Sequence, residues 1–272
     1  MDFLANYLEM APKYKKLGMP VPKKEMIKTA EQIEGIKKAG LINNAVLDEV
    51  AKNIHVGMST LDIDNIVYNK TKELGGIPAC LGYEGFPKSC CTSINDQVCH
   101  GIPSDKVILK PGDIINVDCT TIYNGFYADA SRMFSFEPID EKAFELIKVT
   151  KESLELSLKV LKPYCRLGDI GYTIEHYAKQ HGFSVVHEIG GHGVGIEFHE
   201  DPYVAHFGKR DTGLVLFPGM VFTIEPMINT GTRKVFLDAS NNWTIYTMDG
   251  GLSAQVEHTV AITEDGYEVL AY

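Results

Sequence analysis

The sequence predicts an α/β (α+β) fold built from two pseudo-symmetric halves, with the functional site in the seam between them. Helical periodicity alternates with short apolar runs typical of strands, and hydrophobic residues make up 44% of the 272 positions. The chain also repeats a spacing. Pro111-Gly112 precedes Asp118 with five intervening residues, and Pro218-Gly219 precedes Glu225 with the same five.

A second repeated pattern supports the two halves. His100-Gly101-Ile102 in the first half matches His192-Gly193-Val194 in the second, and each half adds one further acid from a later apolar run, Asp129 and Glu257. The order of these features is the same in both halves. Two similar halves would place their acids around a shared axis, so we expect one common site.

Composition excludes several classes of protein. The net charge of −10 argues against a general nucleic-acid binder, including a DNA-binding protein. No apolar stretch approaches the roughly 18 residues of a membrane helix, and the first ten residues lack a secretory signal. The six cysteines show no C-x-x-C spacing, so we expect free thiols in a reducing cytoplasm: Cys80, Cys90, Cys91, Cys99, Cys119 and Cys165.

The N-terminal region differs in composition from the rest. Residues 10–28 hold six lysines, one glutamate and three prolines, which predicts a basic, largely non-helical segment. We therefore divide the chain into an extension at residues 1–28 and a main domain at 29–272, with halves at about 29–137 and 138–272.

Four helices are predicted in the main domain. Thr29 to Gln32 offers a capping box, and apolar residues at helical spacing continue to Val50. A second helix is expected to begin near Ser59-Thr60. Residues 141–161 and 168–181 have the periodicity of two more.

The Tyr123-Asn124-Gly125 segment predicts a hairpin turn. A two-residue loop would pair Asp118 with Ser131, whereas a four-residue loop would pair it with Asp129. Both registers place Asp118 and Asp129 on the same sheet face, because side chains alternate with period two. Two like charges there would repel unless a cation lies between them.

These acids and one imidazole suit a metal centre. A buried carboxylate without a partner is costly, so buried charges are paired or bind metal. Oxygen-rich ligation with one nitrogen suits Mn, Fe, Co or Zn, and the set is large enough for two divalent ions. The alternative is a group of solvated acids on a polar sheet face. We interpret the chain as a metallohydrolase with these ligands: Asp118, Asp129, His192, Glu225 and Glu257.

The other histidines divide into three groups. Ordinary structural roles are expected for four of them: His55, His176, His181 and His206. His187 and His258 neighbour ligand positions and are open to a supporting role. His100 occupies the repeat position of His192, and His199 follows His192 by seven residues, so we expect these two to face the site.

The chain resembles the methionine aminopeptidases. The resemblance runs from about Thr29 to the C-terminus and rests on these segments: ACLGYEGFPKSCCTSIN, VCHGIP, GDIINVDCT, GFYADASRMF, GGHGVGIEFHEDP, PGMVFTIEPM and SAQVEHT. It implies the pita-bread fold for residues 29–272, as the catalytic domain. Glu225 and Glu257 are too close in sequence for the extra subdomain of type 2 enzymes, which indicates type 1.

The resemblance implies removal of the N-terminal initiator methionine from nascent polypeptides, with a small second residue favoured. Asp118 would bind one metal ion, Asp129 and Glu257 would bridge both, and His192 with Glu225 would complete the second. A metal-bridging water or hydroxide would attack the first peptide bond, and Glu225 would take its proton.

The resemblance also implies roles for residues around the metals. His199 would stabilise the tetrahedral oxyanion, and His100 would contact the scissile nitrogen or help to protonate the leaving amine. The methionine pocket would be formed by Cys80, Tyr83, Phe86, Cys91, Phe198 and Trp243. Phe86 stands where many relatives carry Tyr. Asn95 and Ser253 match positions that help to hold a monovalent cation.

Other readings remain open at this point. One is an Xaa-Pro aminopeptidase or prolidase of the same fold, although residues 1–28 are too short for the large N-terminal domain usual in those relatives. Another is a non-catalytic, ribosome-associated binding protein. The lysines of residues 10–28 suit docking on ribosomal RNA, and the alternative is a solvated tail. A monomer is the default expectation.

Overall fold

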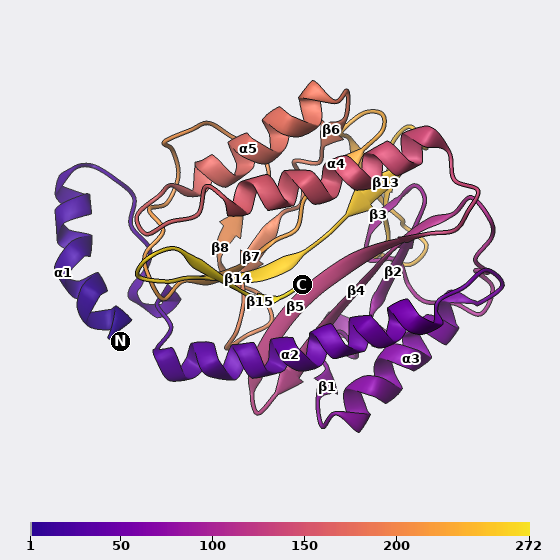
Figure 1. Cartoon of the computed structure of the whole chain (residues 1–272), viewed down its shortest axis with the longest axis horizontal. Coiled ribbons are helices and arrows are strands. Elements are labelled where there is room, and N and C mark those ends of the chain that lie inside the picture. The colour runs from indigo at the N-terminus through magenta and orange to yellow at the C-terminus, as the bar shows by residue number, and fades with distance from the viewer. Residues whose placement is uncertain (1) are drawn as a thin grey trace.

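The computed structural model describes residues 2–272 and shows antiparallel sheets lying between two pairs of helices (Figure 1). The helices are α1 (Phe3–Lys16), α2 (Ala30–Asn53), α3 (Thr60–Glu73), α4 (Glu141–Leu158) and α5 (Leu167–Gln180). The pair α2 and α3 covers one side of the strands, and the pair α4 and α5 covers the other. None of the helices described for residues 2–272 combines the length and apolar composition that crossing a bilayer requires.

The strands of the first half are β1 (Ile77–Pro78), β2 (Cys91–Ile94), β3 (Gln97–Cys99), β4 (Ile114–Tyr123) and β5 (Phe126–Ser135). Those of the second half are β6 (Ser184–Val185), β7 (Gly191–Gly193), β8 (Glu200–Val204), β9 (Val221–Ile224), β10 (Met227–Asn229), β11 (Val235–Leu237), β12 (Ile245–Thr247), β13 (Ser253–Gln255), β14 (His258–Ile262) and β15 (Tyr267–Ala271). The main sheet of the first half joins β1, β2 and β5 to β4, and the five-stranded sheet of the second half has the order β15-β14-β9-β7-β8.

The four helices predicted in the main domain are confirmed. Thr29 and Gln32 form a capping box at the start of α2, and Ser59 with Asp62 forms another at the start of α3. The third helix ends at Leu158, three residues earlier than predicted. The six cysteines are free, as expected, and the structure shows that all six are also buried.

The prediction that residues 10–28 are largely non-helical is wrong for residues 10–16. Helix α1 continues to Lys16 with Pro12 inside it, and Asp2 caps its first turn. Phe3, Tyr7 and Ala11 lie four residues apart on one face of α1, and all three are buried in the core of the second half. This packing outweighs the unfavourable proline, which sequence periodicity alone did not indicate.

Helix α1 is therefore expected to contribute to stability. The Tyr7 ring packs edge-on against Phe217 at 5.4 Å, and its hydroxyl donates a hydrogen bond to the Pro22 carbonyl at 2.8 Å. Replacing Tyr7 with Ala should lower the free energy of unfolding by about 2–4 kcal/mol through lost packing. Chemical denaturation would measure this. A loss below about 0.5 kcal/mol, as for an exposed Leu8→Ala control, would mean that α1 behaves as a loose tail.

The hydrophobic core has two main clusters that follow the two halves. One gathers α4, α5 and the sheet of the second half, together with α1. The other gathers α2 and α3 with β4 and β5, and it also takes in residues of β9, β14 and β15. The second cluster therefore crosses the seam and fixes one half against the other.

Candidate active site

The hairpin of β4 and β5 supplies the acids of the first half. Tyr123 pairs with Phe126 across a two-residue loop, and Asp118 pairs with Ser131, which confirms the first of the two predicted registers. Asp129 pairs with Thr120, two residues beyond Asp118. Asp118 and Asp129 therefore share one face of the hairpin.

The strands β9 and β14 supply the acids of the second half. Glu225 follows β9 directly, and Pro226 after it ends the strand. Glu257 directly precedes β14, whose first residue His258 pairs with Ile224. Glu257 also exchanges main-chain hydrogen bonds with Ser131 of β5, at 3.2 and 3.4 Å. The two pairs of acids thus meet across the seam.

The predicted ligands lie together. His192 Nε2 is 3.7 Å from Asp129 Oδ2 and 3.7 Å from Glu225 Oε1. Ligand atoms of Asp129, His192 and Glu257 all lie within 4.8 Å of one another. Asp118 lines the same cavity as these residues. The structure therefore brings together all five ligands that the sequence indicates.

A main-chain contact sets the tautomer of His192. Its Nδ1 lies 2.9 Å from the carbonyl oxygen of Gly193, which can only accept a hydrogen bond, so Nδ1 carries the proton. Burial lowers the pKa of His192 to about 4, which keeps the ring neutral. Nε2 is then left with a free lone pair that faces carboxylate oxygens, as a metal ligand requires.

The acids strongly disfavour their own ionisation without a cation. Burial, together with the charges of neighbouring acids, raises the pKa of Asp118 and of Glu257 well above the usual range. The same two causes raise the pKa of Glu225 to about 8. Among residues 2–272, no lysine or arginine nitrogen lies within 4.0 Å of these carboxylates, and the one imidazole close to them, that of His192, is neutral. A bound cation would compensate the charge of the ionised carboxylates.

The residues present fit a divalent metal. Asp129 Oδ1 and Glu257 Oε1 are buried, and neither has a hydrogen-bond partner within the part of the chain that the structure describes. Buried polar atoms are nearly always satisfied, so these oxygens indicate a missing ligand. Oxygen donors with one imidazole nitrogen are the donor set expected for a catalytic transition-metal centre.

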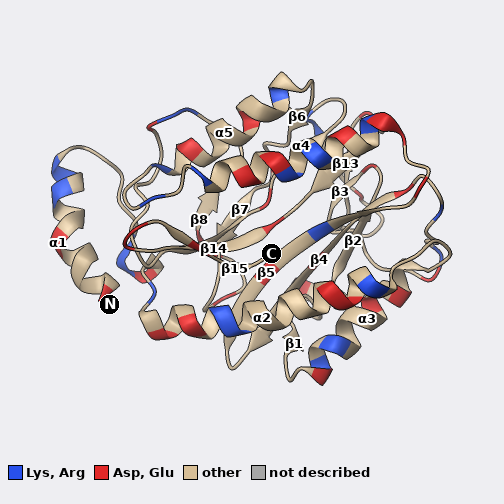
Figure 2. Cartoon of the chain, viewed as in Figure 1, with Lys and Arg blue, Asp and Glu red and all other residues tan. Residues whose placement is uncertain are grey.

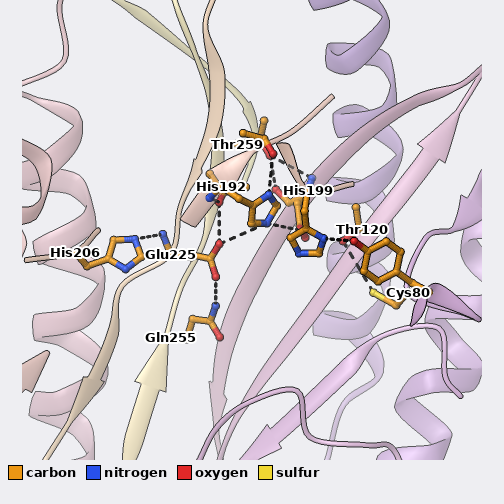
Figure 3. A network of polar contacts seen from close by, with 12 residues as sticks. Cys80, Thr120, His192, His199, His206, Glu225, Gln255 and Thr259 are labelled. Atoms are coloured by element: carbon orange, nitrogen blue, oxygen red, sulfur yellow. Dashed lines mark hydrogen bonds and ion pairs between the residues drawn. The ribbon is translucent and has the colours of Figure 1, made fainter. Parts of the chain in front are cut away.

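Residues that sequence reasoning missed hold the ligands in place. The Thr223 hydroxyl donates to Glu225 Oε1 at 2.8 Å and accepts from the His192 amide at 3.0 Å. Gln255 donates to Glu225 Oε2 at 3.1 Å. Figure 3 shows His206 and Gln255 converging on Glu225 from different sides. Both ligating oxygens of Glu225 are thereby oriented.

Two more of these supporting contacts involve His206 and Thr259. His206 is fully buried, and its Nε2 accepts a hydrogen bond from the Glu225 main-chain amide at 3.1 Å, so its structural role is to hold the main chain of a predicted ligand. Thr259 accepts the Asp129 amide at 3.2 Å and donates to the Asp129 carbonyl at 2.7 Å. Thr223, Gln255 and Thr259 each lie two residues from an acid of the site, a period-two signal that could have found them. No sequence signal marks His206.

Removal of metal should make stability depend on pH with a specific sign. A carboxyl whose pKa is raised in the folded state contributes stability below its unfolded pKa and loses it as pH rises through the folded pKa. In chelator, stability should therefore fall as pH rises from about 5 to about 8, by up to about 1.4 kcal/mol per pH unit for each carboxyl that releases its proton on unfolding. Calorimetry with and without metal would test this; equal slopes in both conditions would contradict it.

The acids form the floor of a cavity of about 520 Å³. Every residue that the sequence indicated for catalysis, metal binding or methionine binding lines this cavity: Cys80, Tyr83, Phe86, Cys91, His100, Asp118, Asp129, His192, Phe198, His199, Glu225, Trp243 and Glu257. Several lining residues were not anticipated: Glu84, Ile189, Gly190, Gly191, Glu200, Asp201 and Tyr203.

One side of the cavity is apolar and rich in aromatic rings and thiols. Cys80, Phe86, Cys91 and Phe198 form a small buried cluster with Trp243 packed against it. The rings of Phe86 and Trp243 meet edge to face at 5.2 Å. Such a surface suits an unbranched, polarizable side chain.

Two histidines stand between this apolar side and the acids. The His199 ring lies 4.2 Å from the His192 ring, and its Nδ1 is 2.9 Å from the Tyr83 hydroxyl. His100 faces Trp243 with the ring centres 6.2 Å apart. Burial lowers the pKa of both His100 and His199 to about 4, so both are neutral hydrogen-bonding groups near pH 7.

The remaining candidates have other surroundings. His187 stacks on Phe207 at 3.8 Å and lies 3.1 Å from Glu175, and neither of these partners is a predicted ligand. The Nδ1 of His258 lies 2.8 Å from the Glu257 carbonyl, which leaves a supporting role open. The Ser253 amide donates to the Asn95 carbonyl at 2.8 Å, which places these two residues side by side.

The chain is similar to known proteins over most of its length. The family described as "Metallopeptidase family M24" matches residues 34–264. Methionine aminopeptidase A of Synechocystis sp. is 49% identical over 240 residues, covering 88% of this chain and 94% of that protein. The crystal structure of methionine aminopeptidase from Rickettsia prowazekii has a TM-score of 0.88 and 42% identity, covering 90% of this chain and 99% of that one.

Similarity to proline-specific relatives is lower. The prolidase from Pyrococcus furiosus has a TM-score of 0.69 and 26% identity, and the match covers 91% of this chain but 65% of that one. The shared part confirms the predicted pita-bread architecture. The rest of the prolidase has no counterpart in this match.

Proposed function

This chain belongs to metallopeptidase family M24 and is a methionine aminopeptidase, and on this premise we propose how its own residues remove the initiator methionine. The proposal rests on two features that lie in the same cavity. Unpartnered carboxylate oxygens and the free Nε2 of His192 lie beside an apolar, thiol-lined pocket. The first feature binds metal, and the second accepts a methionine side chain.

The five ligands would hold two divalent ions, drawn from Co, Mn, Fe and Zn. These ligands would be Asp118, Asp129, His192, Glu225 and Glu257. Two such ions supply a water nucleophile at neutral pH and polarise the scissile carbonyl. The protein contributes fixed ligand orientations, through Thr223 and Gln255 at Glu225 and through the Gly193 carbonyl at His192.

Glu225 is proposed to hold the proton that the nucleophilic water loses. Its carboxylate is buried in the site, with Oε1 3.7 Å from His192 Nε2, so it is placed to accept that proton. His199 is proposed to stabilise the oxyanion. When the Tyr83 hydroxyl donates to Nδ1, the ring proton is on Nε2, which then donates to the carbonyl oxygen. His100 would contact the scissile nitrogen as the amine leaves.

Methionine specificity would come from the apolar side of the cavity. The thioether would lie among the thiols of Cys80 and Cys91 and the rings of Phe86 and Trp243. Phe86 has no hydroxyl, so this wall offers the substrate only apolar contact. A small second residue would be favoured on the far side of the scissile bond.

Peptide hydrolysis tests the proposal. Methionine release from Met-Ala-Ser would be measured on chelated protein and after restoring Mn, Co, Fe or Zn, with an Xaa-Pro peptide in parallel and Asp118→Ala as the inactive control. Metal-dependent release of methionine that is lost in Asp118→Ala is the expected result. Cleavage of the Xaa-Pro peptide alone would support the prolidase alternative. No turnover with metal bound would support the non-catalytic one.

The cellular setting is proposed from the substrate. Nascent N-termini, together with six free thiols, favour the cytoplasm and a monomeric enzyme near the ribosome. Lysines gather at the C-terminal end of α1, where Figure 2 shows a basic tip on an acidic protein. This tip of the 10–28 segment would dock on ribosomal RNA, which a salt-dependent sedimentation assay would test.

A monovalent cation near Asn95 and Ser253 would use the Ser253 hydroxyl, which has no partner within residues 2–272.

A further inference from the structure

The loop of residues 195–200 carries Phe198 and His199 into the cavity from the end of β7 to the start of β8. Its path is irregular: Gly195 has a φ of 138°, and its amide bonds to the Glu197 carbonyl at 3.1 Å. Glu200 organises the loop from its end. Its Oε1 accepts the amides of Ile196 at 2.7 Å and Glu197 at 3.0 Å. One carboxylate oxygen thus fixes the turn that precedes His199.

The other oxygen of Glu200 is held by Lys28. Lys28 Nζ forms an ion pair with Glu200 Oε2, and the Lys28 side chain is only 3% exposed while that of Glu200 is 15% exposed. Lys28 is itself anchored, because its amide donates to the Gly219 carbonyl at 2.8 Å and Thr29 after it caps α2. The pair therefore links the start of α2 to the loop with His199.

Because the ion pair of Lys28 and Glu200 is buried, its loss is expected to disturb the loop. A buried carboxylate without its partner retains its desolvation cost, so removal of one partner leaves an uncompensated charge. The Glu200 carboxylate would then turn toward water and release the two loop amides. By contrast, the side chains of the neighbouring pair, Lys23 and Asp201, are 71% and 58% exposed. An ion pair this exposed contributes little to stability.

We infer that Lys28 is a positioning residue, which fixes the loop of residues 195–200 through Glu200 and thereby places the His199 imidazole for the oxyanion. The inference rests on the role proposed above for His199. Phe198 has further support from ring contacts with Tyr83 at 4.7 Å and Tyr127 at 6.2 Å. A hydrogen bond from His199 to the oxyanion depends on a closer position than the apolar contacts of Phe198, so loss of Lys28 affects the transition state more than methionine binding.

The test compares Lys28→Met, Lys28→Arg, Glu200→Gln and Lys23→Met in the full chain with metal restored. We expect Lys28→Met and Glu200→Gln each to lower kcat about 10–100-fold with KM within about 3-fold of wild type. Lys28→Arg should recover most of the loss, because it restores the charge. Lys23→Met, the matched control, should stay within about 2-fold of wild type.

A second readout does not depend on activity. Amide hydrogen exchange at Ile196 and Glu197 should be faster in Lys28→Met and in Glu200→Gln than in wild type, and unchanged in Lys23→Met. If Lys28→Met fails to fold, Glu200→Gln and Lys28→Arg carry the test.

Failure of this inference can be distinguished from failure of the proposed function. Unchanged kcat in folded Lys28→Met, with wild-type exchange, would overturn the inference. No methionine release by wild type would overturn the proposed function, and faster exchange would still report the link between Lys28 and the loop.

Discussion

Replacing Asp129 with asparagine is expected to abolish methionine release and, at the same time, to stabilise the metal-free protein. Asp129 is 4% exposed, and its Oδ2 faces His192 while its Oδ1 has no partner among residues 2–272. An asparagine keeps the shape but offers one neutral amide oxygen in place of a carboxylate. We expect kcat/KM for Met-Ala-Ser to fall by at least about 10³-fold, with a loss of bound metal.

The gain in stability follows from the crowding of like charges. The charge of Asp129 raises the pKa of Asp118, Glu225 and Glu257, after the larger effect of burial. Removal of one charge lowers this repulsion, so Tm in chelator at about pH 8 should rise. An exposed control, Asp105→Asn, should change neither property. Full metal content and activity in Asp129→Asn would show that Asp129 does not hold the metals.

Replacing His199 with asparagine is expected to lower kcat about 10²–10³-fold while bound metal stays unchanged. His199 Nδ1 lies 2.9 Å from the Tyr83 hydroxyl, and its ring lies 4.2 Å from the His192 ring at an angle of 46°. Its hydrogen bond would strengthen only as charge develops on the carbonyl oxygen, so KM should change little.

A variant of Tyr83 distinguishes the positioning of the His199 ring from the chemical role of that ring. Tyr83→Phe removes the donor to His199 Nδ1 but keeps the ring, so a loss of about 10-fold or less is expected. His55, an exposed histidine, offers a control in His55→Asn. Metal analysis beside steady-state kinetics would check both variants. Loss of metal in His199→Asn would reassign His199 as a ligand.

The sequence predicts those parts of the site that strand geometry determines. The Asn124-Gly125 turn and period-two alternation place Asp118 and Asp129 on one face, and the repeated spacing locates Glu225. These relations are local, so neighbouring residues are enough to establish them.

Contacts between distant segments could not be predicted in this way. His206 reaches the Glu225 amide from 19 residues away, and Tyr83 reaches His199 across 116 residues. Such contacts depend on how the halves pack, which no periodicity records. Helix α1 was missed for a related reason, since its stability comes from burial against the second half and not from its propensity.

The seam has a consequence for synthesis of the chain. Asp118 and Asp129 come from one half and Glu225 and Glu257 from the other, and Thr259 ties β14 to Asp129. A chain elongating at roughly 5–20 residues per second makes the last ligand many seconds after the first. During that interval the first hairpin holds two acids without their partners. A copy of this enzyme therefore has no working metal centre until both halves have folded together, and incomplete chains are inert as peptidases.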